Sequence, residues 1–591
     1  MTNDNGRVYI WWSSREMTKK YVQVGNIPAG KTARIQLKGV GNFKVVSASN
    51  TVSVVSIADD APRFSQSSYA FDLYRYLAAG ESVAAALEAS NLEGGKVTLT
   101  KLSGTLPAGL KAGYDEEAKS VAFTGTVTAK PGVYPVVYQV SETRSGVKVP
   151  GLTASVTFTV KDPTDPVADP EGANPAVQVT RTLKDIAIID PATKRLVGVL
   201  QLTLNRKGNA SGKYVSESGT VSLTAKNWNA FDPETLALTT ELENKKSGVQ
   251  VRAQANADFS VEVVVDDPRA SDVPGEGYTD GQLWSAEASE AWKGYYTVAL
   301  PVENVVSNAT DDLVSTGTGY LTLDFTSKSA LKTGTFKWAG VLPNGTAVSG
   351  STMLGAPYAG KSAIEEDCRW VTLPVFKNSG TDTLSACLKI RDEADTEAVR
   401  NTDRRVIWAA DDITAFWKHG ERSTDVCDSV VDLGVYGAIY DKTEDLGACC
   451  LAHYKTQSML LGFDVSRLVW TAFGEPGAVP PVSVEISETA ITADPDDLKA
   501  ANATLKFNRS TGVVNGSVKL NCADRVVSAS YKGVILTGWS ETCCGIAAGL
   551  KAMPFVNGAF YFTDKVENAI GRKFSVKRGG AVSIDVGVPV E

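Results

Sequence analysis

The sequence predicts an all-β protein of several domains in series, with a β-sandwich followed by repeated β-meander sandwich or barrel domains. Apolar and polar side chains alternate at residues 153–160 and 249–255, which is typical of strands with one buried face. Turn dipeptides such as Pro131-Gly132 and Asn344-Gly345 separate short apolar runs. Helical periodicity is scarce, and with 52 glycines this favours sandwiches or barrels.

Length and composition limit the number of domains and the classes of partner that the chain can have. The 591 residues suffice for about three to five domains of about 100–200 residues each. Hydrophobic residues make up 43% and charged residues 21%, so each domain can bury a core. The net charge is −8 and no basic stripe occurs, so we expect no nucleic-acid partner. No apolar run approaches the ~18–20 residues that cross a bilayer, so we expect no transmembrane segment.

Shifts in pattern predict the order of the domains. Residues 162–175 hold three Asp-Pro pairs without apolar periodicity, which predicts a semi-rigid linker because proline restricts its own backbone and that of the preceding residue. Before the linker we expect a small β domain at 1–62 and a β-sandwich at 63–161. After it we expect a β-meander or barrel domain at 176–362 and a related, cysteine-containing β domain at 363–591.

Helical signals are few and short. Residues 494–500 offer an aspartate cap, Pro495 and an acidic first turn, which predict a helix start. Residues 285–292 and 392–400 are each expected to form a few turns. The alanine-rich residues 82–90 would be helical on propensity alone.

Three segments share one pattern, in which a β-run, a glycine turn and a second β-run lead to a third. They are residues 200–214 with 220–223, 319–338 with 346–349, and 503–519 with 526–529. Each predicts a β-meander, which cannot bury its apolar face alone and must pair or close on another. We therefore expect 176–591 to form two related domains or one large barrel-like body, although any β protein yields some hairpins of this kind.

A motif of glycine, proline and leucine marks residues 64–160. It comprises residues 103–110 (SGTLPAGL), Tyr114-Asp115, residues 121–126 (VAFTGT) and residues 130–134 (KPGVY). In this motif the segment resembles the immunoglobulin-like, cadherin-like domains of bacterial surface proteins, although Val127 stands where that family usually has proline. More loosely, the repeats after residue 176 resemble those that follow such domains in large secreted bacterial proteins.

The resemblance implies an immunoglobulin-like β-sandwich at 63–161. It places Leu106 and Leu110 in the core and Tyr134 at the start of a late strand with its ring buried. It also implies that residues 82–90 form a strand rather than a helix.

All eight cysteines lie in the C-terminal region. An even number confined to one region predicts about four disulfides and an oxidising compartment, with reduced core thiols as the alternative. Cys449-Cys450 near His453 also suggests zinc ligands or a cysteine nucleophile, but adjacent cysteines rarely bind one ion. The disulfide candidates are Cys368, Cys387, Cys427, Cys449, Cys450, Cys522, Cys543 and Cys544.

No pattern in the sequence indicates catalysis. The only histidines, His419 and His453, lie in no recognisable catalytic setting, and nucleophile elbows, phosphate loops and zinc-protease motifs are absent. We predict that the chain is not an enzyme and uses no cofactor; an enzyme with dispersed carboxylates is a third hypothesis. Structural calcium is a weaker alternative at the acidic clusters 162–169, 266–272 and 494–497, which solvated turns and helix caps also explain.

The eleven tryptophans bear on ligands, because exposed indoles stack on sugars whereas buried ones form cores. The candidates include Trp11, Trp12, Trp284, Trp292, Trp417 and Trp539. We predict a non-enzymatic secreted or cell-surface structural or adhesion protein, with surface glycans or other extracellular proteins as partners. The alternative is a carbohydrate-binding or accessory component of a polysaccharide-degrading system.

The N-terminal residues bear on localisation. They show no basic stretch followed by an apolar one, so no signal peptide is recognisable. The sequence begins abruptly with the strand-like residues 7–12. A cytosolic protein is one reading; we adopt the other, an extracellular or cell-surface protein whose N-terminus is truncated here.

Overall fold

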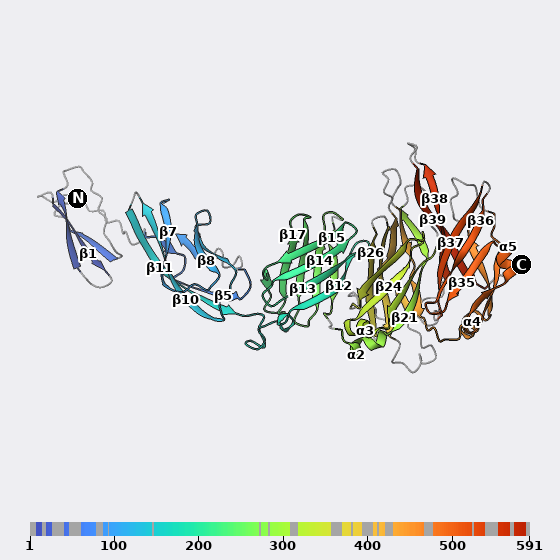
Figure 1. Cartoon of the computed structure of the whole chain (residues 1–591). Coiled ribbons are helices and arrows are strands. Elements are labelled where there is room, and N and C mark those ends of the chain that lie inside the picture. The colour runs from blue at the N-terminus through green and yellow to red at the C-terminus, as the bar shows by residue number, and fades with distance from the viewer. Residues whose placement is uncertain are drawn as a thin grey trace. The chain divides into compact units, whose positions relative to one another are not determined.

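In this computed structural model strands make up 61% and helices 7%, which confirms the all-β prediction (Figure 1). None of the helices in the described part of the chain has the length and apolarity needed to span a membrane. The described residues run from 7 to 586 except for 15–18, 27–40, 47–60, 79–86, 91, 93, 145–146, 271–272, 282–283, 308–316, 356–368, 380–381, 393–405, 410–412, 420–428, 466–476, 523–524, 538–553 and 568–572.

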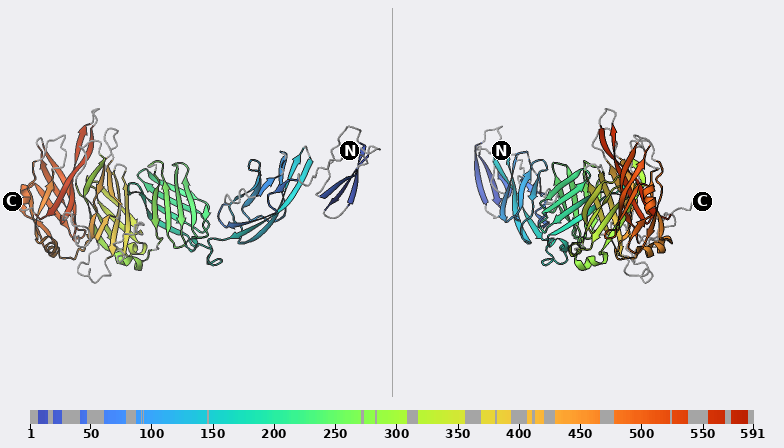
Figure 2. Two further views of the ribbon diagram at one scale, coloured as in Figure 1. Left: turned by 180° about the vertical axis from the view of Figure 1, so that it is seen from behind. Right: turned by 45° about the vertical axis from the view of Figure 1, so that its right-hand side comes forward.

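The chain divides into two compact units. Unit 1 comprises Met1–Gln178 together with two short segments from farther along the chain, Arg206–Gly208 and Lys226–Thr239. Unit 2 comprises Val179–Asn205, Asn209–Ala225 and Thr240–Glu591. Both consist mainly of antiparallel sheets, which Figure 2 shows from two further directions.

Unit 1 begins with a three-stranded antiparallel sheet in the order β2-β1-β3 and continues with two four-stranded sheets. The two four-stranded sheets, β5-β11-β10-β7 and β4-β6-β9-β8, share one core around Phe123, Tyr138 and Phe158. The strands are β1 (Arg7–Ser14), β2 (Lys19–Asn26), β3 (Gly41–Val46), β4 (Arg63–Phe64), β5 (Ser68–Tyr74), β6 (Leu87–Ser90), β7 (Lys96–Gly104), β8 (Leu110–Asp115), β9 (Ser120–Gly125), β10 (Gly132–Arg144) and β11 (Val147–Lys161).

Several local expectations for this part can be compared with the structure. In β11 the predicted alternation holds, with Ala154, Val156 and Phe158 buried between more exposed neighbours. Leu110 is buried, and the last residues of the alanine-rich segment form β6, so they are strand and not helix. Tyr134 is half-buried: it packs against this core, and its hydroxyl donates to the backbone oxygen of Lys130 at 2.8 Å.

The next sheet has nine strands in the order β15-β14-β13-β12-β20-β19-β18-β17-β16, and all of them belong to unit 2 except β16 and the start of β17. A further pair between Thr224 and Glu243 joins β15 to β17, so the sheet closes into a barrel-like form. The strands are β12 (Arg181–Asp190), β13 (Arg195–Leu204), β14 (Ala210–Ser216), β15 (Gly219–Ala225), β16 (Ala230–Phe231), β17 (Leu238–Asn244), β18 (Val249–Ala255), β19 (Val261–Asp266) and β20 (Gly275–Thr279).

The second sheet has eleven strands drawn from two stretches of sequence. They are β21 (Gly294–Leu300), β22 (Val302–Ser307), β23 (Gly319–Phe325), β24 (Thr335–Val341), β25 (Ala347–Met353), β26 (Arg369–Asn378), β27 (Asp382–Asp392), β28 (Val406–Ala409), β29 (Ala415–His419), β30 (Ser429–Leu433) and β31 (Tyr436–Ile439). Because β21 pairs with both β23 and β31, one sheet extends across the predicted domain boundary at 362–363, and that boundary needs correction.

The third sheet has eight strands in the order β34-β33-β32-β39-β38-β37-β36-β35. The strands are β32 (Ser458–Asp464), β33 (Val482–Ile486), β34 (Ile491–Ala493), β35 (Ala503–Asn508), β36 (Val513–Asn521), β37 (Val526–Ile535), β38 (Val556–Glu567) and β39 (Lys573–Asp585). Its own hydrophobic core includes Tyr531, Phe560 and Val518. The cysteine-containing region therefore belongs to two sheets and not to a single domain.

The three predicted meanders are confirmed as runs of consecutive antiparallel neighbours. They are β13-β14-β15, β23-β24-β25 and β35-β36-β37. Each lies in a different sheet, so the repeated pattern occurs once in each of the three sheets of unit 2.

The helices are all short. The predicted ones at 285–292 and 494–500 are confirmed as α2 (Ala286–Ser289) with η3 (Glu290–Trp292), and as α5 (Pro495–Ala500). Asp494 caps α5 by accepting from the backbone nitrogens of Asp496 and Asp497 at 2.8 and 3.2 Å. The sequence did not predict η2 (Pro175–Val177), α3 (Lys328–Thr333) or α4 (Leu446–Tyr454). The helix expected at 392–400 lies almost wholly outside the described residues.

Candidate functional site

Each meander has a glycine in its first turn that lies directly against an aromatic side chain. Gly208, Gly334 and Gly512 have φ of 76°, 64° and 65°, in the left-handed region that glycine adopts most easily. A Cβ added to them would lie 2.2 Å from the backbone nitrogen of Trp228, 2.5 Å from Trp284 Cγ and 3.1 Å from Tyr440 Cδ2, respectively. These glycines thus serve both the turn and a close ring contact.

The polar atom of each aromatic side chain is also bound. Trp228 Nε1 donates to the oxygen of Arg206 at 3.2 Å, and Tyr440 Oη donates to the oxygen of Arg509 at 2.6 Å. Both acceptors precede the turn glycine by two or three residues in the same turn. Trp284 Nε1 instead donates to the oxygen of Leu354, just after β25, at 2.8 Å. In the first and third meanders the ring therefore binds the backbone oxygen of the turn arginine, whereas in the second it binds a residue after β25. We call the contact of a ring with its turn glycine and its backbone acceptor the lock of that meander.

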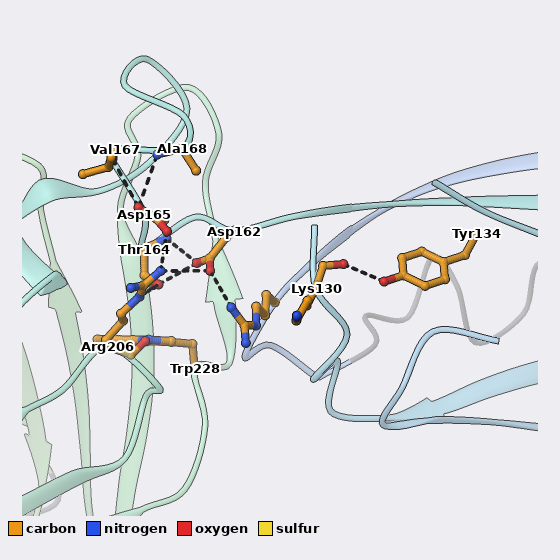
Figure 3. A network of polar contacts seen from close by, with 10 residues as sticks. Lys130, Tyr134, Asp162, Thr164, Asp165, Val167, Ala168, Arg206 and Trp228 are labelled. Carbon is orange, nitrogen blue, oxygen red and sulfur yellow. Dashed lines mark hydrogen bonds and ion pairs between the residues drawn. The ribbon is translucent and has the colours of Figure 1, made fainter. Parts of the chain in front are cut away.

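In unit 1 the turn arginine binds the Asp/Pro segment (Figure 3). Arg206 Nη2 lies 3.1 Å from Asp162 Oδ2 and 2.8 Å from Asp165 Oδ2, and Arg206 Nε donates to Thr164 Oγ1 at 3.1 Å. On the other side, Arg75 Nη1 donates to Asp162 Oδ2 at 3.1 Å. We call this group, Arg75, Asp162, Thr164, Asp165 and Arg206, the first arginine clamp.

Asp162 is the centre of this clamp. Only 2% of its side chain is exposed, and its other oxygen accepts from the backbone nitrogen of Thr164 at 3.1 Å and from the Thr164 hydroxyl at 2.6 Å. A buried carboxylate requires such a full set of donors, because an unpaired charge in the interior is costly. Asp162 therefore depends on both arginines and on its own turn.

The segment predicted as a semi-rigid spacer is folded into unit 1. Thr164 and Asn174 are fully buried, and Asn174 caps η2 by accepting from the Ala176 nitrogen at 2.8 Å. Asn174 also donates to the oxygen of Leu236 at 2.9 Å. The proline spacing alone predicted a semi-rigid linker. The polar side chains between the prolines instead form turns, which are compatible with proline.

A second arginine clamp lies in unit 2, and its arginine binds backbone oxygens instead of side chains. Arg509 donates from Nη1 to the oxygen of Glu488 at 2.9 Å and from Nη2 to the oxygen of Glu444 at 2.7 Å. The segment it holds begins with Asp441, which accepts from the nitrogen and hydroxyl of Thr443 at 2.8 and 2.7 Å, as Asp162 does from Thr164. In both clamps an Asp-x-Thr turn is held by the arginine of a meander turn.

Hydrogen bonds lower the pKa of one aspartate in each clamp segment, Asp165 and Asp441. The hydrogen bond from Arg206, aided by backbone donors from Ala168 and Val167, lowers the pKa of Asp165 below its ordinary value. The backbone and hydroxyl donors of Thr443 lower the pKa of Asp441 in the same way. Burial raises the pKa of Tyr440 to about 12, so its hydroxyl keeps the proton that it donates to Arg509.

We predict that acid loosens the first clamp. Because the pKa of Asp165 is lower in the folded state, its stabilising effect is complete above the unfolded value near 4 and is lost as the pH falls through the folded value. Calorimetry should therefore show that Asp165→Asn lowers the melting temperature of unit 1 at pH 7. At pH 3 wild type and variant should be closer together. An equal difference at both pH values would contradict this prediction.

His419 belongs to a separate polar cluster. Its Nδ1 lies 2.8 Å from Asp382 Oδ1, and the same oxygen accepts from Trp417 Nε1 at 2.9 Å and from Asn344 Nδ2 at 3.1 Å. A buried aspartate on Nδ1 orients a histidine as in hydrolytic triads. Among the described residues, however, no nucleophilic side chain is hydrogen-bonded to His419. The cluster therefore holds an aspartate–histidine pair without the nucleophile of a triad among the described residues.

The sequence offered no signal for Asp382. Its partners lie on β29 and in the turn after β24, 35 to 38 residues away in the sequence. His453 lies in α4, and its side chain is not described.

The described cysteines are buried. Cys387, Cys450 and Cys522 are free thiols, and burial raises the pKa of Cys387 and Cys450 to about 12. Cys449 lies beside Cys450 in α4 and is also buried. Cys368, Cys427, Cys543 and Cys544 lie outside the described residues, so the disulfide assignment stays a prediction.

Most of the described acidic clusters bind protein groups. Asp162 and Asp165 bind Arg206, Asp267 is paired with Arg269, and Asp494 caps α5. Asp272 lies outside the described residues. Within the described part of the chain no three acidic, histidine or cysteine side chains form a group suited to a metal ion.

The tryptophans expected to be candidate sugar platforms are mostly core residues where they are described. Trp292 and Trp417 are buried, whereas Trp284 is half-buried. The side chains of Trp11 and Trp12 are not described, and Trp539 lies outside the described residues.

Comparison with known proteins gives no relative: no family model matches the chain, and no curated protein matches it.

Proposed function

We propose that this chain is a non-enzymatic structural or adhesion protein, secreted or held at a cell surface, whose tandem β-modules act as spacers and interaction surfaces. The observation that best supports this role is the pair of arginine clamps. In each clamp the meander-turn arginine binds a turn-forming segment, Asp162–Asp165 or Asp441–Glu444, that precedes the meander in the sequence. Fixed segments of this kind suit a protein whose modules must hold defined positions, because connections between domains are otherwise flexible by default.

The immunoglobulin-like identity of residues 63–161 is part of the same proposal. It is supported by the motif at residues 103–134 and by two four-stranded sheets that share one core. Such domains commonly act as repeated extracellular modules. An extracellular location also agrees with the cysteine pattern, in which Cys368, Cys427, Cys543 and Cys544 remain candidates for disulfides.

Surface labelling tests the location. Intact source cells and their medium would be probed with an antibody against residues 63–161, and the recovered chain would be mapped by mass spectrometry without reduction. We expect labelling without lysis and disulfide-linked peptides from the C-terminal region. Labelling that appears only after lysis, with eight free thiols, would contradict the proposed location.

The structural role predicts that the clamp holds residues 162–177 in place. Asp162→Ala removes the acceptor shared by Arg75, Arg206 and Thr164, and we expect a loss of about 2 kcal/mol in the stability of unit 1. Hydrogen exchange should show the amides of this segment protected in the wild-type chain and exchanging faster in the variant.

A matched control is Asp72→Asn. Asp72 pairs with Lys161 at 3.1 Å, but both side chains are about half exposed, and such surface pairs contribute little. Its exchange pattern should match that of the wild type. If residues 162–177 exchange rapidly in the wild-type chain itself, the clamp does not order the segment and the structural proposal loses its main support.

A further inference from the structure

A cavity of about 250 Å³ lies in unit 2, where β12, the end of β20, the residues after β25 and the strands β26 and β27 come together. Its volume is just below the range of about 300–1,000 Å³ that is usual for drug-sized ligands, so it suits a smaller molecule. Its lining includes Asp185, Tyr278, Thr279, Trp284, Thr372 and Cys387.

Asp185 is one of two aspartates that line this cavity, with Asp280, and it is held at a structural cost. It lies in the bulge where the register of β12 shifts between Leu183 and Ile186, with φ of 52°. Left-handed backbone is unfavourable for residues other than glycine, and such positions gather at functional sites. One carboxylate oxygen accepts from the Met353 nitrogen at 2.8 Å, and among the described residues the other oxygen has no partner.

Burial adds a second cost at Asp185. It raises the pKa of this carboxyl, and the Met353 amide offsets only part of the effect. Because the folded pKa is higher than the unfolded one, this group favours folding most at low pH, and that contribution is lost as the pH rises through the folded value. Burial of this carboxyl group is therefore a cost that folding alone does not favour.

Trp284 forms a fixed aromatic wall of the cavity. Its Nε1 is bound to the oxygen of Leu354 at 2.8 Å, its ring packs edge-on against Trp292 at 5.7 Å between centroids, and Gly334 lies against it. A ring held in this way loses little conformational freedom when a ligand stacks on it. Trp284 is half-buried, unlike the fully buried Trp228 of the first meander.

The remaining lining favours binding of a neutral, hydroxyl-rich ligand over covalent chemistry. Four threonines and Tyr278 line the cavity, and the lysines Lys184 and Lys332 among its lining balance the two aspartates in formal charge. The one thiol, Cys387, is unsuited to nucleophilic attack because burial raises its pKa to about 12.

We propose that this cavity binds a single sugar unit, with the Asp185 carboxylate accepting hydrogen bonds from its hydroxyls and the Trp284 indole covering its apolar face. A sugar combines donors for a fixed carboxylate with a C–H face for an aromatic ring, which are the two features that the cavity offers. The inference is independent of the structural role proposed above.

Ligand-observed saturation-transfer NMR on the full chain tests the proposal with glucose, galactose, mannose and N-acetylglucosamine. We expect transfer to at least one sugar and a Kd at least tenfold weaker in Asp185→Asn, which loses a charged acceptor. Asp185→Asn should fold with equal or higher stability, because it removes the carboxyl group whose ionised form burial disfavours. The matched control is Asp266→Asn, on the exposed face of β19, which should bind as the wild type does.

Three outcomes would overturn the proposal. The first is the absence of transfer to all four sugars, and the second is equal affinity in the wild type and Asp185→Asn. The third is preferential binding of ethylammonium, which would identify the carboxylate and indole as a cation site.

Discussion

Replacing Trp228 by alanine is expected to destabilise unit 1 by about 3–5 kcal/mol, as usual for a fully buried tryptophan. The side chain has no exposed surface, and its Nε1 donates to the oxygen of Arg206, the clamp arginine. Its backbone nitrogen donates to the oxygen of Tyr76 at 3.2 Å, and that bond survives the substitution. The loss therefore comes from the cavity and from the freed turn beneath the ring.

Calorimetry with two comparison variants separates these causes. Trp228→Phe keeps most of the volume but loses the Nε1 donor, and we expect a loss of about 1–2 kcal/mol. Val167→Ala, at a side chain with 81% of its surface exposed in the same unit, should change stability by less than about 0.5 kcal/mol. If Trp228→Ala is as mild as Val167→Ala, the ring does not hold the turn.

The local features of the meanders could be predicted from sequence, whereas their locks could not. Alternation and turn glycines act over a few residues, so the three meanders were predicted with their turns. The aromatic partner comes 20 residues after Gly208 but 50 residues before Gly334 and 72 before Gly512. Because the order changes from one meander to the next, no spacing rule connects ring and glycine.

The same limit explains the wrong boundary at 362–363. The boundary was placed there because the composition of the sequence changes where the cysteines begin. In the structure, however, β21 pairs with β31, about 140 residues away in the sequence. Strand pairing over such separations depends on packing and not on local pattern. The position of the linker was predicted correctly but its folded form was not, because Arg206, which binds Asp162 and Thr164, lies more than 40 residues later in the sequence.

The locks also bear on how the three meanders are related. The first and third share a turn arginine, a ring that donates to that arginine's oxygen, and a nearby Asp-x-Thr turn. The guanidinium of Arg206 binds the side chains of its turn, whereas that of Arg509 binds the backbone oxygen of Glu444, the residue after its turn. The second keeps the glycine and ring but inserts α3 into the turn, and its ring lines the cavity instead. These details make the first and third meanders structurally alike, whereas the second differs from them at the proposed sugar site.

Replacing Asp382 by alanine is expected to cost unit 2 about 3–5 kcal/mol. The substitution leaves Trp417 Nε1 and Asn344 Nδ2 buried without their acceptor, and removing one partner from a buried polar cluster costs far more than the net value of its bonds. Thermal unfolding of the full chain, followed by calorimetry, measures the change in the transition of unit 2.

The comparison with His419→Ala distinguishes a structural cluster from half of a catalytic site. His419 keeps 15% of its side chain exposed, so water can replace it, and we expect a loss of about 1 kcal/mol. A structural cluster predicts this large asymmetry between Asp382→Ala and His419→Ala. Near-equal, small losses from both substitutions would mean that the buried carboxylate is not needed for folding. An aspartate held on histidine Nδ1 without a folding role would then favour the dispersed-carboxylate enzyme over the structural protein.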